Sequence, residues 1–215
     1  MAEMDNTNAS YTLCPKIAYF SNSMSLHTTI QNCTLCADTL QHGPRPVLQF
    51  SPHSKIVIIG QAPGSKVHAS GKPWDDQSGK KLRQWLDVSD DDFYNPDKFA
   101  LVPMGFCYPG TGKSGDLPPK KICAPTWHPD VLAQFQEKPL VVLIGTYAQK
   151  YYLNTKQNLT ETVLRAEEYL PEFLPLPHPS PRNQHWLKKN PWFETGVIPL
   201  LQTEVKKHLA KEHRL

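Results

Sequence analysis

The 215-residue sequence predicts an α/β fold in which a central, mainly parallel, four-stranded sheet lies between two layers of helices. Two observations predict it. Four short apolar segments recur along the chain, and segments with the hydrophobic spacing of helices lie between them. Strands that alternate with helices favour right-handed β-α-β crossovers and a three-layer α/β/α architecture. In such open sheets, ligands bind beyond the carboxyl ends of the strands.

The four apolar segments are the expected strands. Residues 55–60 (KIVIIG) and 139–145 (PLVVLIG) are continuous and rich in β-branched side chains, which is typical of strands that are buried on both faces of a sheet. Residues 99–104 (FALVPM) and 172–177 (EFLPLP) complete the set.

The expected helices lie between these strands. Residues 78–86 begin at a serine that can cap a helix, and they place Leu82, Trp85 and Leu86 on one face. Three further helices are expected at residues 128–135, 146–153 and 159–170.

Length and composition limit the class of protein. A chain of this length can bury one sizeable core, so we expect a single domain over residues 11–215 and a disordered tail over residues 1–10. No apolar segment approaches the roughly 20 residues that cross a bilayer, and the start of the chain lacks the pattern of a signal peptide. We therefore expect a monomeric, cytoplasmic protein that does not bind membranes.

The charge is uneven along the chain. The whole sequence has 23 basic and 20 acidic residues, whereas residues 178–215 alone have seven basic and three acidic residues, a net charge of +4. A basic segment of this kind suits contact with phosphates. A solvated helix end produces the same pattern, so charge alone leaves nucleic-acid binding open.

A glycine-rich segment follows the first expected strand. It consists of Gly60, Gln61, Ala62, Pro63 and Gly64, and residues 71–74 (GKPW) come shortly after it. Glycine lets the backbone approach a ligand closely, and a helix start offers amide N–H groups to an anion. The spacing fits neither the dinucleotide-binding fingerprint nor a phosphate-binding loop. A plain strand-to-helix turn is the alternative interpretation.

A polar loop follows the fourth expected strand. In residues 177–183 (PHPSPRN), a proline occupies every second position from Pro177 to Pro181. These prolines stiffen the loop and lower the entropy cost of binding a partner. A histidine in such a loop is a better candidate for function than the other eight histidines of the chain. His178 is therefore the candidate catalytic residue.

Four of the five cysteines form a second pattern. Cys33 and Cys36 are a C-x-x-C pair, and Cys107 and Cys123 follow with 15 residues between them. In a cytoplasmic chain this pattern indicates a metal site before it indicates disulfides, and four thiolates suit an iron–sulfur cluster or structural zinc. Buried free cysteines are the alternative, and Cys14 is left over.

The two loops resemble the motifs of a known family. GQAPG followed by GKPW is similar to the first motif of the uracil-DNA glycosylase superfamily, and HPSPRN is similar to its second motif. Residues 107–125 and 177–193 look most like a group of small bacterial uracil-DNA glycosylase family proteins. The cysteine spacing is similar to that of thermostable members that hold a [4Fe–4S] cluster, which favours the cluster over zinc.

The resemblance implies a monofunctional DNA-repair glycosylase. Such an enzyme flips uracil, or a related damaged base, out of single- or double-stranded DNA and hydrolyses its N-glycosidic bond, leaving an abasic site. The protein would associate with the nucleoid while it acts. The implied residues are His178, Gln61, Asp75 and Asp76 for catalysis, Gly60, Ala62, Pro63, Gly64 and Trp74 for the base, and Ser180, Pro181, Arg182 and Asn183 for DNA.

Two of these residues have specific implied roles. His178 matches the histidine that donates a hydrogen bond to O2 of the departing uracil, where negative charge develops. Trp74 stands where the family usually has a phenylalanine that stacks on the flipped base. A core aromatic without contact to a base is the alternative for Trp74.

Two departures from the family pattern bear on activity. Several members have a water-activating aspartate where this sequence has Ala62; Asp75 or Asp76 can replace it, or can cap the following helix instead. Many members read uracil with an asparagine at the end of the second strand, and residues 102–106 (VPMGF) contain no amide side chain. A catalytically weak or silent protein that binds damaged or single-stranded DNA is therefore the alternative function.

Further DNA contacts are expected from basic and aromatic residues near the two loops. The candidate phosphate contacts are Lys113, Lys120, Lys121, Lys188 and Lys189, and for the first three solvent-exposed lysines without a partner are the alternative. Trp186 suits stacking on DNA. Packing of Trp186 and Trp192 into the core is the alternative.

Overall fold

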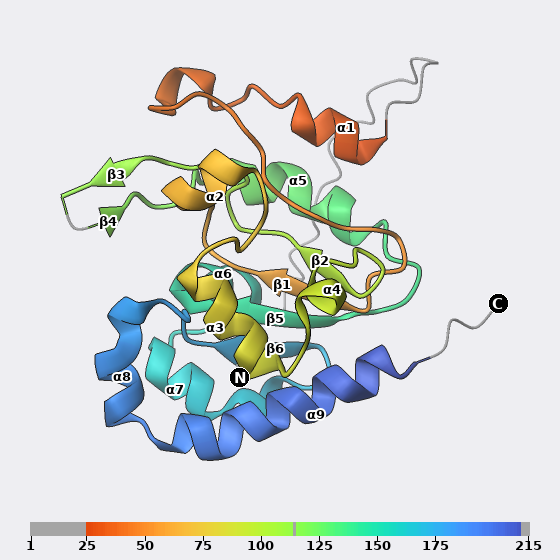
Figure 1. Cartoon of the computed structure of the whole chain (residues 1–215), viewed down its shortest axis with the longest axis vertical. Coiled ribbons are helices and arrows are strands. Elements are labelled where there is room, and N and C mark those ends of the chain that lie inside the picture. The colour runs from red at the N-terminus through yellow and green to blue at the C-terminus, as the bar shows by residue number, and fades with distance from the viewer. Residues whose placement is uncertain (1–24, 114, 212–215) are drawn as a thin grey trace, which may run out of the picture.

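The computed structural model describes residues 25–113 and 115–211. Within this part of the chain, a four-stranded, wholly parallel sheet has the strand order β2-β1-β5-β6 (Figure 1). The expected three-layer α/β/α fold is confirmed. The expected tail at residues 1–10 and the leftover Cys14 lie outside the described residues, and the single-domain assignment stays a prediction.

All four expected strands are present. They are β1 (Ile56–Ile59), β2 (Phe99–Leu101), β5 (Leu140–Ile144) and β6 (Phe173–Leu176). The α-helices of the described part are α1 (Leu26–Gln31), α2 (Ser65–Ser70), α3 (Gln77–Leu86), α4 (Asp90–Phe93), α5 (Cys123–Leu132), α6 (Gly145–Leu153), α7 (Leu159–Leu164), α8 (Gln184–Lys189) and α9 (Ile198–Leu209). None of the helices in the described ranges is long and apolar enough to cross a membrane.

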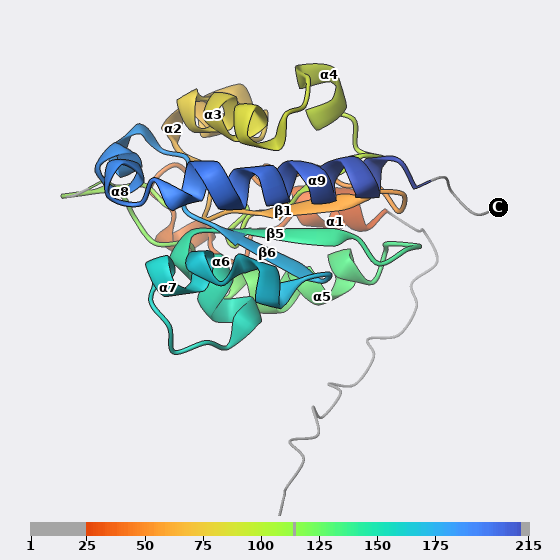
Figure 2. The same ribbon diagram turned by 90° about the horizontal axis from the view of Figure 1, so that it is seen from below.

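Alternate residues of the strands contribute to two separate cores. In β1, Ile56 and Ile58 pack in one cluster with α3 and α9, whereas Val57 and Ile59 pack in a second cluster with α1, α5 and α6. Figure 2 shows α3 and α9 on one side of the sheet and α5 and α6 on the other. Burial of the strands on both faces is what a parallel sheet between two helical layers requires.

Three of the expected helices begin or end at other residues. Asp76, and not Ser78, caps α3, because its carboxylate accepts the N–H of Gly79 at 2.8 Å. Helix α5 begins at Cys123, five residues before the expected start at 128. The segment at 159–170 divides into α7 and a 3-10 turn, Ala166–Tyr169.

A small antiparallel hairpin interrupts the long connection between β2 and α5. Its strands are β3 (Thr111–Gly112) and β4 (Gly115–Asp116), and Thr111 pairs with Asp116. The hairpin projects on the same side of the molecule as α2 and α8, whereas the carboxyl end of α9 lies on the opposite side (Figure 1). The connection between Cys107 and Cys123 therefore reaches the region of the two motif loops.

Candidate active site

A cavity of about 430 Å³ lies at the carboxyl ends of β1, β2 and β6. This volume is in the range of pockets that bind small molecules. The glycine-rich loop after β1, the proline-rich loop after β6 and the β3–β4 hairpin line it together. Of the residues implied in catalysis, base binding and DNA binding, all except Asp75 and Pro181 line this cavity.

The turn at Gly60–Gly64 presents free amide groups. The carbonyl groups of Gly60 and Gln61 accept the N–H groups of Met104 and Gly105 at 2.9 and 3.0 Å, which fixes the turn against the end of β2. In contrast, the N–H groups of Gln61, Ala62 and Gly64 have no acceptor among the described residues. Cavity-lining donors of this kind can stabilise an anion.

Trp74 forms the wall of the cavity at Gly60. Its φ is +57°, in the left-handed region that non-glycine residues seldom adopt. The indole lies so close to Gly60 that a Cβ at Gly60 would be 2.7 Å from Cζ2 of Trp74. Trp74 packs against the core and also lines the cavity, so core packing does not remove the indole from the site, and its stacking on a base stays a prediction.

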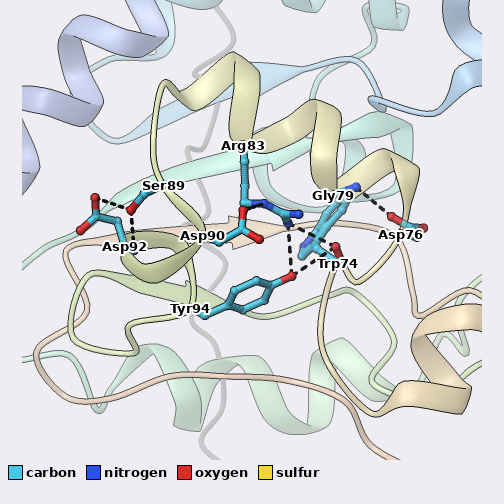
Figure 3. Close-up of polar contacts among 8 residues, drawn as sticks. All are labelled: Trp74, Asp76, Gly79, Arg83, Ser89, Asp90, Asp92 and Tyr94. Atoms are coloured by element: carbon cyan, nitrogen blue, oxygen red, sulfur yellow. Dashed lines mark hydrogen bonds and ion pairs between the residues drawn. The ribbon is translucent and has the colours of Figure 1, made fainter.

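A polar clamp holds the backbone of Trp74 (Figure 3). The Trp74 carbonyl oxygen accepts hydrogen bonds from Nη1 of Arg83 and from Oη of Tyr94, each at 3.4 Å. Arg83 also donates to Tyr94 at 3.2 Å and forms an ion pair with Asp90 at 2.7 Å. Gly79 is needed beneath this carbonyl, because a Cβ there would lie 1.7 Å from the oxygen.

His178 lies beside Trp74 with its proton on a defined nitrogen. The two ring centroids are 5.7 Å apart. The backbone N–H of Ser180 donates to Nδ1 of His178 at 3.2 Å, so in the neutral ring Nε2 carries the hydrogen. Burial lowers the pKa of His178, and the carboxylates of Asp76 and Asp116 oppose that shift. A neutral imidazole with Nε2–H as donor results.

The rest of the proline-rich loop positions His178. The side-chain amide of Asn183 donates to the carbonyl of His178 at 2.8 Å, which ties the two ends of the loop together. Ser180 accepts the N–H of Arg182 at 3.3 Å and caps a short 3-10 turn, Pro181–Asn183. Ser180, Arg182 and Asn183 line the cavity, while Pro181 lies outside it.

Three carboxylates lie near the motif loops in different settings. Asp75 is exposed and does not line the cavity. Asp76 lines the cavity, but one of its oxygens caps α3. Asp116, on β4, also lines the cavity and has no counterpart in the sequence-based site. The glycines around residues 111–116 are a hairpin signal, but they do not indicate where that hairpin packs.

The four cysteines of the predicted metal site line one cavity of their own. Apolar side chains, among them Leu35, Phe106 and Trp127, surround them. The backbone N–H groups of Phe106 and Arg45 donate to the sulfurs of Cys123 and Cys107, the former at 3.3 Å. Burial raises the pKa of Cys107 to about 11 and that of Cys123 to about 12.

The four cysteines form no disulfide, and their sulfurs are not arranged as the ligands of a single metal ion. Cys33, Cys36, Cys107 and Cys123 are all free thiols. Within residues 25–113 and 115–211, no group of three or more His, Cys, Asp or Glu side chains is arranged to hold a metal ion. The site thus brings the four predicted ligands together around one space without a tight four-sulfur arrangement.

Two of the residues expected to contact DNA, Lys120 and Trp186, have partners within the protein. The ammonium of Lys120 donates to the carbonyl of Thr39 at 2.7 Å, which joins the segment before α5 to the 3-10 turn after Cys36. Trp186 donates to Thr160 at 2.9 Å and packs against the main core together with Trp192. Both tryptophans pack against the main core as the alternative interpretation expects, and both are only half-buried, so stacking of Trp186 on DNA stays a prediction.

The site is thus a cavity at the carboxyl edge of a parallel sheet in an α/β protein, and the two motif loops place an indole and a histidine on its walls. A family model described as the Uracil DNA glycosylase superfamily matches residues 48–202 of the chain. The protein belongs to this superfamily. Membership points to DNA as the substrate and to a DNA glycosylase type of function.

Proposed function

We propose that the protein excises uracil from DNA by flipping it into the cavity and hydrolysing its N-glycosidic bond. The single observation that carries this proposal is the convergence of a neutral His178, with Nε2–H available, and the unpaired amides of the Gly60–Gly64 turn on one cavity. Donors preorganised around a site of developing negative charge stabilise the transition state.

Trp74, His178 and the amides of the glycine-rich turn have separate roles in the proposed reaction. The flipped base stacks on the indole of Trp74, which offsets part of the cost of leaving the DNA stack. As the N–C1′ bond breaks, the electron pair moves onto the base, and His178 donates through Nε2 to the base oxygen. The amides of Gln61, Ala62 and Gly64 stabilise the same anion.

Gln61 is the side chain that we assign to recognition of the uracil edge. Uracil presents an N3–H donor beside the O4 acceptor, and a side-chain amide satisfies both. After β2, the N–H groups of Met104 and Gly105 are already bonded, and Pro103 has none. The amide of Asn183 is bonded to His178. Gln61, which lines the cavity, thus takes the place of the absent asparagine.

The test is a glycosylase assay with single-uracil oligonucleotides. Single strands and duplexes with uracil opposite guanine or adenine are incubated with the protein and then treated with alkali. We expect alkali-labile strands with wild-type protein and a loss of roughly 10²- to 10³-fold in rate with His178→Ala. His185→Ala is the matched control, because His185 is exposed on α8 and does not line the cavity.

The alternative function makes the opposite prediction in the same assay. A catalytically silent member, which Ala62 in place of the family aspartate suggests, would bind damaged or single-stranded DNA in a salt-dependent way without forming abasic sites. Intact strands in every context with well-folded protein would reject the excision proposal. Abasic sites that disappear with His178→Ala would reject the silent alternative.

We also propose that the four-cysteine cavity holds a [4Fe–4S] cluster as a structural scaffold. Four thiols around one apolar space, with backbone N–H donors on two of the sulfurs, suit cluster ligation. Zinc requires four sulfurs within about 3.8 Å of one another, given Zn–S distances of about 2.3 Å, whereas the larger cluster spaces its ligands more widely. When bound, the cluster would cross-link the Cys33–Cys36 segment to the ends of the 107–123 connection.

Metal analysis of the purified protein tests the cluster. Four iron and four sulfide per chain, with a brown colour that reductant bleaches, is the expected result. One zinc per chain in a colourless preparation would assign the site to structural zinc instead. Neither metal in anaerobically prepared protein would leave the cysteines as free buried thiols and reject the proposal.

A further inference from the structure

We propose that Asp116, on the β3–β4 hairpin, is the carboxylate that positions and deprotonates the attacking water. This inference rests on the proposed excision function and deepens it. The first motif has Ala62 where several family members have the water-activating aspartate. We assign that role to a carboxylate from a different segment of the chain, the connection between Cys107 and Cys123.

Asp116 lies at the opposite end of the glycine-rich turn from Trp74. Its Oδ2 is 3.4 Å from the position that a Cβ on Gly64 would take, whereas the indole of Trp74 abuts Gly60. Both side chains line the same cavity. The carboxylate thus lies across the cavity from the indole, where the sugar of a base stacked on Trp74 can be placed.

The hairpin and its neighbours orient this carboxylate. Tyr108 donates a hydrogen bond to Oδ1 of Asp116 at 3.5 Å and contacts the hydroxyl of Thr111, the residue that pairs with Asp116. The ring of Tyr108 is buried and stacks on His42 with 5.4 Å between centroids. The tyrosine thus fixes one carboxylate oxygen and leaves the other toward Gly64.

The proposed reaction is a hydrolysis that needs only water and the side chains and amides that line the cavity. Water attacks C1′ as the N–C1′ bond breaks, and the bonding electron pair leaves with the base, which His178 and the turn amides stabilise as an anion. Asp116 accepts one proton from the attacking water and later releases it to solvent, while the expelled base takes up a proton. The products are the free base and an abasic site.

The other nearby carboxylates are less suited to this role. Asp76 uses one oxygen to cap α3, and Asp75 is exposed outside the cavity. A cap residue that turned toward the sugar would leave the first turn of α3 without its acceptor. Asp116 caps no helix, and its hydrogen bond with Tyr108 engages Oδ1 and leaves Oδ2 toward Gly64.

Single-turnover excision with Asp116→Asn tests the assignment. We expect the rate to fall by about 100-fold or more, while affinity for an oligonucleotide with a hydrolysis-resistant 2′-fluoro uridine stays within about threefold of wild type. Exogenous formate should restore part of the rate of Asp116→Ala, since it supplies a carboxylate that a purely structural defect would not use. Asp130→Asn, an exposed change on α5, is the control that keeps the wild-type rate.

The outcomes separate this assignment from the proposed function. Excision by Asp116→Asn at nearly the wild-type rate overturns the role of Asp116, and so does a large loss that appears only with Asp76→Asn. Asparagine retains the cap at position 76, so that variant removes only the charge. A wild-type protein that excises no base overturns the proposed function and the role of Asp116 together.

Discussion

The two walls of the cavity are held in place by different means. The Trp74 wall belongs to the main core, where the indole packs against buried side chains and Arg83 and Tyr94 clamp the carbonyl. The Asp116 wall consists of two-residue strands in a connection that begins and ends beside cysteines. Core packing thus fixes the wall to which we assign base binding, and local contacts fix the wall that we assign to water.

Two of the four cysteines, Cys107 and Cys123, lie at the ends of the connection that contains the Asp116 wall. A hairpin of two-residue strands has little apolar surface of its own and is not stable alone. Its anchors are the Gly110–Leu117 backbone hydrogen bond of 2.8 Å, the buried Tyr108 and the cysteines at either end. A group bound by those cysteines would stabilise the Asp116 wall as the core stabilises the Trp74 wall.

Among the changes that test how the two walls are held, removal of the cysteine anchors of the hairpin should have the largest effect. Cys107→Ser combined with Cys123→Ser should lower the excision rate by about 100-fold, because a displacement of about 1 Å in a catalytic group costs that much. Affinity for the hydrolysis-resistant oligonucleotide should fall much less, since the Trp74 wall stays in place. Single-turnover rates and fluorescence-anisotropy binding measure the two effects.

Cys14→Ser is the matched control for the double variant, because Cys14 lies outside the predicted ligand set. It should leave rate, affinity and metal content unchanged. Equal losses of rate and affinity in the double variant would contradict the comparison, since they would show that both walls depend on the cysteines.

Acid should destabilise the folded protein through His128, on the α5 side of the sheet. His128 is buried on α5, where its ring nitrogens contact Tyr152 Oη at 2.6 Å and the carbonyl of Pro103 at 3.0 Å. Burial lowers its pKa to about 4. Between pH 6.5 and 4 the unfolded chain binds a proton that the folded protein does not, so the free energy of unfolding should fall by about 3 kcal/mol.

Urea unfolding at pH 7 and pH 4.5 measures this loss. His128→Phe should reduce the pH dependence, because it removes the titrating group while the other histidines contribute equally to both proteins. An identical pH dependence in the variant would assign the acid sensitivity to another histidine, such as His208, whose pKa burial also lowers.

The parts of the site that the sequence predicts are those with local signals. Glycines that precede or follow a strand and a histidine between prolines are readable without the fold, and most of these residues do line the cavity. Asp116 gives no such signal, because its position depends on how a hairpin packs against Gly64. A contact between Gly64 and Asp116, which lie 52 positions apart, is set by tertiary packing.

The elements of the fold also differ in how clearly the local sequence indicates them. The β-branched runs of the strands are local patterns, and all four strands follow from them. Helix α9 has an equally local pattern, with Leu201, Val205 and His208 buried on one face, but Pro199 obscures its start. Proline is nevertheless tolerated in the first turn of a helix, so Pro199 is compatible with a helix that begins at Ile198.

A smaller effect is expected from loosening the Trp74 wall. Arg83→Met removes one hydrogen bond to the Trp74 carbonyl and should cost about 1 kcal/mol of stability, with a few-fold weaker binding of the hydrolysis-resistant oligonucleotide. Tyr94→Phe removes the other bond and should act similarly. The excision rate of bound substrate should stay near wild type. A selective loss of that rate would place the clamp in the chemical step and contradict the division between the walls.

The smallest effect is expected from the basic residues of α9. Lys206 forms an ion pair with Asp87 at 2.9 Å, and Lys207 forms one with Glu204 at 3.2 Å. The carboxyl end of α9 lies beside Lys55, at the amino end of β1 and away from the cavity. Lys206→Ala should therefore leave the salt dependence of DNA binding unchanged, whereas Arg182→Ala, at the cavity, should reduce the log–log slope by about one. A reduced slope for Lys206→Ala would show that DNA extends across α9, and the terminal excess of positive charge would then belong to the DNA-binding surface after all.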